Sequence, residues 1–483
     1  MMGTPAPHLV FQTPEDGIPR RRLLLLTHHF PPSEAVGAIR WHKFAVHMGR
    51  AGWTFDIVSA GTPGIAGPFP ADLPPGSRLW QVELRDGLAV RAEQAMLAVY
   101  GRAKRAGADR TGAASERSDA AAVVRTEGVR TADVRWNLRS PRGWVRLWFT
   151  LRDLSAGVAT ARQVERAALH VANPRVHRAV ITSGPPHYWH VGGGRAAARL
   201  GLPLVIDLRD PWGVTDLVHE YFATPWWVAA AGHYERGAVG RAALVVANTE
   251  PLRDALAGRY PESASRIITV MNGIDDDPIP EGMSYQAFTI GYAGTIYFGR
   301  DPRPLFSGAA RVVADLQLTP EEFQIRFIGD ATHYGGVPLQ TLAREAGLES
   351  HVMVGGRVSR IEAHHFLAKC HMLVSLPWED GLTIPAKLFE YMRFPAWLLV
   401  FADRDSAMDH MLRGHDADVV GNADIDGVAA AIRRRFLQFR GGGRPAAMTT
   451  DTGLSRASQA AILLSAIEHL RRQERAQTGT AQI

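Results

Sequence analysis

The chain of 483 residues contains a single cysteine, Cys370, and no Cys/His cluster with the spacing of a zinc site. One cysteine cannot form an internal disulfide, which excludes a disulfide-stabilised scaffold and favours a reducing compartment, by default the cytoplasm. Long apolar runs are missing as well. The run at residues 23–26 is four leucines, too short for a signal peptide or a membrane span, so we predict a buried strand there.

Lysine is scarce: the four lysines are Lys43, Lys104, Lys369 and Lys387, and arginine supplies nearly all other positive charge. The net charge is +6, and residues 101–148 alone hold eleven Arg/Lys against five Asp/Glu. Such an excess suits an anionic membrane surface, a phosphate-rich substrate or nucleic acid. Because no nucleic-acid-binding motif accompanies the charge, we do not expect nucleic acid as a partner.

The length favours two or three domains, and the apolar segments form two series separated by helical stretches. The first series covers residues 23–27, 54–59, 179–182, 204–207, 244–247 and 267–271, and the second covers residues 288–292, 324–328, 351–354, 372–376 and 397–401. This alternation predicts two Rossmann-like α/β domains with a ligand in the cleft between them.

The domain boundaries follow from composition. We expect a loose N-terminal tail (1–20), an N-terminal domain (21–278) with a basic insert at about 100–150, a C-terminal domain (284–455) and a helix (456–475), with the option that this helix crosses back to the first domain. Residues 275–283 are rich in proline and acidic residues, which predicts a water-exposed hinge.

The first strand is not followed by the G-x-G-x-x-G fingerprint, which counts against a dehydrogenase. A single glycine, Gly37, lies near the predicted helix start. There it could let the backbone approach a bound diphosphate or sugar, or it could serve a turn alone.

Two further motifs follow strands of the first domain, where open α/β sheets place their ligands. His187 in the segment 182–190 could orient or deprotonate a hydroxyl group, or be purely structural. Asp207, Arg209 and Asp210 pack three charges into four residues, so we expect them to pair with one another or to reach a ligand.

In the second domain a strand runs into a glycine-rich loop that carries Gly294, Thr295 and Arg300. Free backbone N–H groups and a guanidinium suit a diphosphate, although a turn with solvated arginines is the alternative.

Lys387 and Glu390 lie on one face of a predicted helix start, where a lysine is unfavourable unless an anion offsets the dipole. We therefore expect Lys387 to contact phosphate and Glu390 to accept hydrogen bonds from ribose or sugar hydroxyls. The alternative is a surface ion pair between the two side chains.

Together these motifs resemble the retaining glycosyltransferases of family four, in particular the bacterial branch that builds capsule, O-antigen and other surface polysaccharides. The resemblance spans roughly residues 21–413 and depends on the order and spacing of its motifs, which lie at Phe30-Pro-Pro, Ser183-Gly-Pro-Pro-His187, 207–212, Asn248-Thr-Glu250, Asn272-Gly-Ile-Asp275, 291–295, Gly356-Arg-Val-Ser359 and 384–391.

The resemblance implies a GT-B fold whose second domain binds a nucleotide sugar and whose first domain binds the acceptor. Gly294, Thr295 and Arg300 would contact the diphosphate, Val358 the base through its backbone, Glu390 the ribose and Lys387 the phosphates. The expected activity is metal-independent hexosyl transfer, with retention, from a nucleotide-diphosphate sugar to a glycan or lipid-linked acceptor in surface-polysaccharide biosynthesis.

The chemistry requires cations that stabilise the leaving diphosphate, so Lys387 and Arg300 are the catalytic candidates, with His187 as a third. No metal or cofactor is expected. Asp275-Asp276-Asp277 has a D-x-D pattern, which holds manganese in another glycosyltransferase fold, but it lies in the predicted linker and we discount it.

One departure from the family leaves the sugar-binding carboxylate open, because Leu382 stands where the family has glutamate. Glu379 and Asp380 are nearby substitutes. A nucleotide-sugar epimerase of GT-B fold and a non-catalytic sugar-nucleotide-binding protein are the alternative functions.

Residues 135–149 interleave arginine with tryptophan, a composition typical of a membrane interface. We expect either peripheral binding to the inner leaflet, next to a lipid-diphosphate-linked acceptor, or packing of these aromatic side chains inside the first domain. The expected location is the cytoplasm, with peripheral attachment to the inner membrane as the further option.

Overall fold

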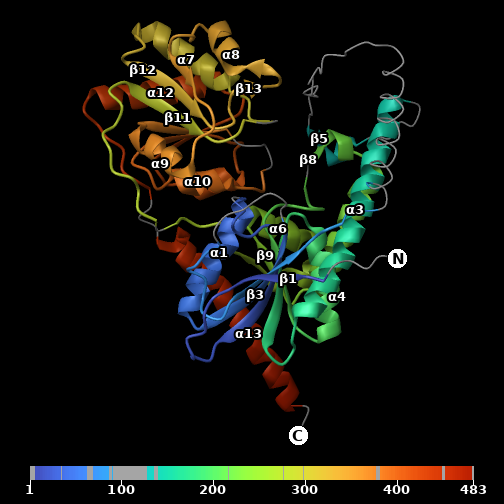
Figure 1. Cartoon of the computed structure of the whole chain (residues 1–483). Coiled ribbons are helices and arrows are strands. Elements are labelled where there is room, and N and C mark those ends of the chain that lie inside the picture. The colour runs from blue at the N-terminus through green and yellow to red at the C-terminus, as the bar shows by residue number, and fades with distance from the viewer. Residues whose placement is uncertain are drawn as a thin grey trace, which may run out of the picture.

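The structure is a computed structural model that describes residues 6–33, 35–61, 69–85, 87, 90, 128–134, 140–215, 217–275, 277–296, 299–376, 381–448 and 452–480. These residues form two α/β domains, one above the other in Figure 1. None of the helices in the described ranges is long and apolar enough to cross a membrane.

The N-terminal domain is built on a sheet with the strand order β1-β4-β3-β2-β6-β7-β9-β10. The strands are β1 (His8–Gln12), β2 (Arg21–Thr27), β3 (Trp53–Ala60), β4 (Arg78–Val82), β6 (His177–Gly184), β7 (Leu204–Leu208), β9 (Leu244–Ala247) and β10 (Ile267–Thr269). All neighbours are parallel except β1 and β4. The leucines of residues 23–26 are fully buried, because helices cover both faces of a parallel sheet.

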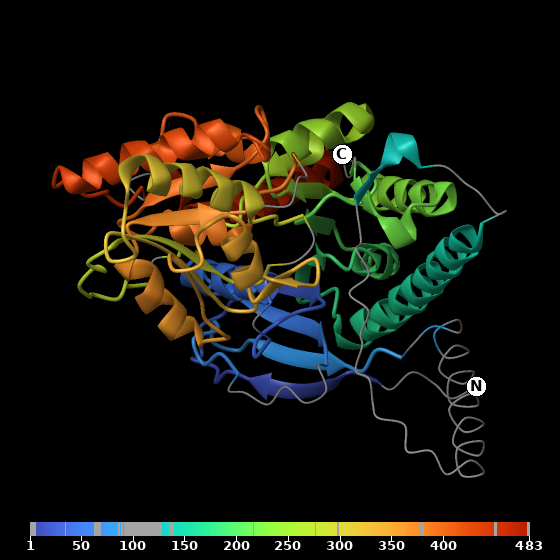
Figure 2. The ribbon, with the colours of Figure 1, turned by 90° about the horizontal axis from the view of Figure 1, so that it is seen from above.

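The helices of this domain are α1 (Val36–Arg50), α3 (Pro141–Val171), α4 (Tyr188–Leu200), α5 (Pro225–Arg241) and α6 (Glu250–Arg259). A two-stranded ribbon pairs β5 (Gly128–Arg130) with β8 (Leu217–His219), and the short helix η2 (Glu220–Phe222) follows it. The long helix α3 lies at the edge of the domain, away from the C-terminal domain (Figure 2).

The predicted strands of this domain are confirmed to within a few residues, but the prediction of a loose tail up to residue 20 is wrong in part. β1 pairs antiparallel with β4 and forms the sheet edge. The hydroxyl of Thr13 is buried and donates to the carbonyl of Pro74 at 2.8 Å. A five-residue edge strand carries too weak a periodicity to be seen in the sequence.

The C-terminal domain has a parallel sheet with the order β15-β12-β11-β16-β17-β18. Its strands are β11 (Phe288–Ala293), β12 (Phe323–Ile328), β15 (Val352–Val354), β16 (Met372–Ser375), β17 (Trp397–Phe401) and β18 (Ala417–Val420), beside the hairpin β13 (His333–Tyr334) and β14 (Val337–Pro338). Its helices are α7 (Arg303–Leu316), α8 (Leu339–Glu345), α9 (Arg360–Lys369), α10 (Ala386–Tyr391), α11 (Ala407–Leu412) and α12 (Ile425–Arg440). Apolar clusters cover both faces of this sheet.

The chain crosses between the domains twice, and the two crossings meet at a parallel bridge between Ile274 and Ser455. After the second crossing, helix α13 (Arg456–Thr480) returns to the first domain, where Leu463 and Ile467 share a core with Trp41 and Phe44 of α1 (Figure 1).

The expectation of a water-exposed hinge is wrong at its first residue. Only 6% of the Asp275 side chain is exposed, and it lies 3.2 Å from Arg456 and 3.6 Å from Arg360. The acidic residue pairs with arginines that only the folded chain brings to it. Asp276 lies outside the described residues.

Candidate active site in the interdomain cleft

Two cavities of about 780 and 540 Å³ lie along the interface of the two domains. Both are lined by Gly294, Ala386 and Lys387. Thr295 and Arg300 line the larger cavity, and Val358 and Glu390 line the smaller one. The C-terminal residues expected to bind a donor therefore line two adjacent cavities, and Lys387 belongs to the walls of both.

Gly294 follows β11 and has a positive φ of 130°, which favours glycine. A Cβ atom there would lie 3.0 Å from the Lys387 ammonium nitrogen. The glycine thus leaves the space that the lysine occupies at the end of the strand.

Tyr292 holds the two cations of the site next to each other. Its hydroxyl accepts hydrogen bonds from Lys387 Nζ at 2.9 Å and from Arg300 Nη1 at 3.4 Å, and it donates to the carbonyl of Thr295 at 2.8 Å. Lys387 Nζ also lies 4.1 Å from the centre of the Tyr292 ring, a cation–π distance.

Burial and the nearby Arg300 guanidinium hold the pKa of Lys387 well below that of an ordinary lysine. A bound anion would relieve this repulsion and favour the charged ammonium. The pair is therefore suited to a diphosphate at the junction of the cavities.

Glu390 lies in the smaller cavity and accepts a short hydrogen bond of 2.6 Å from His364 of α9. Arg360, one turn earlier on α9, lies 3.7 Å from the same carboxylate. Burial alone would raise the pKa of Glu390, but the His364 hydrogen bond and nearby guanidinium groups lower it overall. The carboxylate is thus a charged acceptor, suited to hydroxyl groups.

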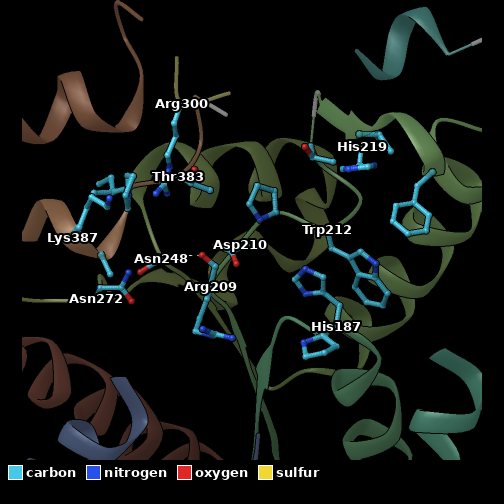
Figure 3. Close-up of a pocket in the computed structure, with 18 of the residues that line it drawn as sticks. His187, Arg209, Asp210, Trp212, His219, Asn248, Asn272, Arg300, Thr383 and Lys387 are labelled. Carbon is cyan, nitrogen blue, oxygen red and sulfur yellow. Dashed lines mark hydrogen bonds between the residues drawn. The ribbon is translucent and has the colours of Figure 1, made fainter. Parts of the chain in front are cut away.

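The larger cavity extends into the N-terminal domain, where His187, Arg209, Asp210 and Trp212 line it. Figure 3 shows Lys387 and Arg300 on one side, His187 and Trp212 on the other, and Asp210 between them. Asp210 is exposed to the cavity. The surrounding protein atoms partly displace water from its carboxyl group, and this desolvation raises its pKa.

The His187 ring stacks on Trp212 with 5.1 Å between the ring centres. Burial holds the pKa of His187 well below its usual range, and the neighbouring His190 adds to the effect. A neutral imidazole in this position can accept a hydrogen bond from a bound hydroxyl group.

Asp207 does not belong to the cavity lining, contrary to one of the options expected from the sequence. Its carboxylate is fully buried beneath the site, 2.9 Å from the Arg40 guanidinium, and it also accepts from Trp41 and Ser183. Asp207 thus takes the ion-pair option, with a partner on α1 rather than within its own motif.

Gly37 lines neither of the two cavities; the side chain of Arg209 covers it. A Cβ atom at residue 37 would lie 2.2 Å from Arg209 Nη1, so the glycine admits a guanidinium of the protein rather than a ligand at this point. Arg209 also donates to the carbonyl of Pro185 at 2.9 Å.

Glu379 and Asp380, the suggested substitutes for a sugar-binding carboxylate, lie outside the described residues. The carbonyl of Leu382 accepts a hydrogen bond of 2.6 Å from the Thr249 hydroxyl of the N-terminal domain. This hydrogen bond joins the two domains beside the site.

Sequence reasoning missed Tyr292 and His364. Tyr292 belongs to the motif at residues 291–295, so the sequence could have indicated it. Its hydroxyl contacts, however, depend on the packing of α10 against β11. His364 belongs to no motif, and its contact with Glu390 joins two helices that are adjacent only in space.

No protein-family model matches this chain, and no curated protein sequence does. Solved structures do match along nearly the whole length. The α,α-trehalose 6-phosphate synthase of Burkholderia multivorans matches with a TM-score of 0.53 and 12% identity over 96% of this chain and 99% of that one. A trehalose-6-phosphate protein from E. coli bound with UDP-2-fluoro glucose matches with 0.51 and 13%, over 94% and 98%.

The α,α-trehalose-phosphate synthase of Burkholderia xenovorans, in complex with glucose-6-phosphate, matches with a TM-score of 0.50 and 13% identity over 93% of this chain and 97% of that one. These similarities confirm the predicted GT-B fold of two Rossmann-like domains facing a central cleft.

Proposed function

We propose that the protein is a glycosyltransferase that moves a sugar from a nucleotide-diphosphate sugar to a glycan or lipid-linked acceptor. The observation that carries the proposal is the Lys387–Arg300 pair at the junction of the two cavities. On one side of this pair is the smaller cavity, where the charged carboxylate of Glu390 is suited to ribose. On the other side is the larger cavity, which reaches the N-terminal domain. The GT-B fold of the similar structures supports the same proposal.

In this proposal the nucleotide lies in the smaller cavity, with Val358 beside the base and Glu390 at the ribose. The diphosphate lies against Gly294 and Thr295. Breaking the bond between the anomeric carbon and the phosphate leaves negative charge on the diphosphate, and Lys387 and Arg300 stabilise it. His187 faces the acceptor side. Retention is proposed from the resemblance to retaining glycosyltransferases. No metal ion is needed in this proposal, since protein cations serve the leaving group.

Calorimetry with UDP, GDP, dTDP and ADP tests the donor half of the proposal. We expect one nucleoside diphosphate to bind clearly more tightly than the others, and EDTA to leave this binding unchanged. Mass spectrometry with the matching sugar nucleotides and a lipid-linked glycan then identifies the product. Lack of binding by all four nucleotides would contradict the proposal, and a changed donor sugar without an acceptor would favour the epimerase.

We further propose peripheral attachment to the inner membrane through α3, which fits a role in surface-polysaccharide biosynthesis. Trp144, Val145, Trp148 and Leu151 are exposed by 59, 45, 37 and 48% and recur with helical spacing. The opposite side of α3 packs into the domain: Thr150 is fully buried there, and its hydroxyl shares a hydrogen bond of 2.8 Å with the hydroxyl of Thr224. An exposed apolar stripe beside Arg142 suits anionic lipid. Residues 135–139 lie outside the described residues.

Sedimentation with anionic vesicles tests this attachment. We expect binding to vesicles that contain phosphatidylglycerol, weaker binding to pure phosphatidylcholine, and a loss of at least tenfold when Trp144 and Trp148 are both changed to Ser. Replacing the equally exposed Leu437 of α12 by Ser is the matched control. Equal sedimentation of both variants would contradict a membrane surface on α3.

A further inference from the structure

The part of the larger cavity that lies in the N-terminal domain is lined mainly by aromatic side chains. We call this part the aromatic chamber. It is lined by Tyr188, Trp212, His219, Phe222 and Trp227, together with the carboxylate of Asp153. These residues come from α4, the loop after β7, β8, η2, α5 and α3. The sequence motifs assign no function to any of these five aromatic side chains.

The aromatic side chains are held firmly by one another. Trp212 lies parallel to His187 and to Tyr234, at centre distances of 5.1 and 6.4 Å. Phe222 and Trp227 form a second stacked pair at 5.9 Å. Both members of this second pair are partly exposed, so the pair offers apolar surface to a ligand in the cavity.

Asp153 gives the chamber a polar acceptor at a defined place. Its Oδ2 atom accepts a hydrogen bond of 2.9 Å from the indole N–H of Trp227. Burial raises the pKa of this carboxyl group. The carboxyl group thus lies beside an aromatic wall, with further capacity to bond a ligand hydroxyl.

The charges around this half do not suit a phosphate. Among the described residues that line it, the charged groups are the carboxyl groups of Asp153 and Asp210 and the guanidinium of Arg209. Arg209 lies against Gly37 and donates to the carbonyl of Pro185. The cations that suit phosphate, Lys387 and Arg300, are on the opposite side of the cavity (Figure 3).

We propose that the aromatic chamber is a subsite for an uncharged sugar ring, namely the terminal residue of the acceptor, and that phosphorylated sugars are rejected there. This rests on the proposed transferase function. The weakly positive C–H groups of a pyranose pack against the electron-rich face of an aromatic ring. Its hydroxyl groups can donate to a carboxyl oxygen, whereas a phosphate would share this half of the cavity with the carboxyl groups of Asp153 and Asp210.

Titration with simple sugars tests the subsite without knowledge of the natural acceptor. The probes are the methyl glycosides of glucose, galactose and mannose, with glucose 6-phosphate and mannose 6-phosphate as charged counterparts. Calorimetry and tryptophan fluorescence follow binding. We expect at least one methyl glycoside to bind, and each sugar phosphate to bind at least tenfold more weakly than its neutral counterpart. Tighter binding of the phosphates, or no binding of any glycoside, would overturn the proposal.

Adjacent tryptophans of α5 provide a matched pair of variants. Trp227 lines the chamber, whereas Trp226 is 62% exposed and outside its lining. We expect Trp227→Leu to weaken glycoside binding at least fivefold and Trp226→Leu to leave it unchanged. Phe222→Leu is expected to weaken glycoside binding in the same way. It serves as a second test if Trp227→Leu does not fold. Equal affinities of wild type, Trp227→Leu and Phe222→Leu would overturn the proposal.

Nucleotide binding separates the failure of this inference from the failure of the transferase proposal. The chamber variants leave the nucleotide cavity intact, so Trp227→Leu is expected to bind the preferred nucleoside diphosphate as tightly as wild type. A protein that binds nucleotide but no methyl glycoside retains the proposed donor site and lacks the subsite. A protein that binds glycosides but none of the nucleotides retains the subsite and contradicts the transferase.

Discussion

The two domains treat positive charge at the carboxyl ends of their sheets in opposite ways. In the N-terminal domain, Arg40 is 1% exposed, pairs with Asp207, and donates to the carbonyls of Val270 and Met271. In the C-terminal domain, Lys387 lies beside another cation, Arg300, and both donate to the neutral hydroxyl of Tyr292.

The difference distinguishes a cation with a structural partner from the cations that we propose to bind the donor. A buried arginine whose charge is matched by a carboxylate is fixed in place and has little to offer a ligand. Two neighbouring cations held by a hydroxyl group and carbonyls are placed to attract an anion. Burial and their mutual repulsion lower the pKa of Lys387, and a bound anion would favour its charged form. Four variants and conditions test this contrast.

The largest effect is expected on stability, from Asp207→Asn. The variant leaves Arg40 as a buried charge without its carboxylate, which should lower the free energy of unfolding by about 3–5 kcal/mol. Urea denaturation measures it. Asp210→Asn is the control, because Asp210 faces the cavity and its loss should change stability by less than about 0.5 kcal/mol. If both variants lost the same free energy of unfolding, the distinction between a buried, paired carboxylate and a cavity-facing one would be wrong.

Lys387→Ala is expected to leave stability nearly unchanged and to lower transfer by about 10²–10³-fold, since it removes a cation at the leaving group. The rate of product formation at saturating donor measures the loss. Lys369→Ala, at the end of α9 and outside the lining of both cavities, is the matched control. Substantial turnover by Lys387→Ala would move the main cation role to Arg300.

The affinity for the preferred nucleoside diphosphate should fall as the pH rises through the lowered pKa of Lys387. Only the protonated amine attracts the anion, and the bound anion in turn favours protonation, so affinity is highest below that pKa and falls by up to about tenfold per pH unit above it. Calorimetry over a pH series measures the slope. Lys387→Arg should flatten it, and an unchanged slope would assign the titration to another group.

Tyr292→Phe should have the smallest effect, a loss of about tenfold in kcat/KM, which corresponds to one hydrogen-bonding hydroxyl. Without the hydroxyl, Lys387 and Arg300 lose their shared acceptor while the ring remains. Steady-state kinetics compares it with Tyr334→Phe, in the hairpin outside both cavities, which should behave as wild type. A wild-type rate for Tyr292→Phe would mean that the cations are held by the carbonyls alone.

Much of the fold was predictable because the strands are short, apolar and regularly spaced. The edge strand β1 and the burial of Asp275 were not, since both depend on partners far away in sequence, on β4 and on α13. The C-terminal part of the site was easier to predict than the N-terminal part. Lys387 and Glu390 stand in one motif, whereas Asp207 and Gly37 gain their surroundings from Arg40 and Arg209.

By itself, the sequence determined two Rossmann-like domains and a set of cavity-lining residues in the second, because hydrophobic periodicity and local spacing act over a few residues. The tertiary structure decided which charges are neutralised and which face the cleft. It paired Asp207 with Arg40, joined Glu390 to His364 and gathered the aromatic chamber from six segments. These outcomes depend on the packing of distant elements, which fixes burial, and burial sets the cost of each charge.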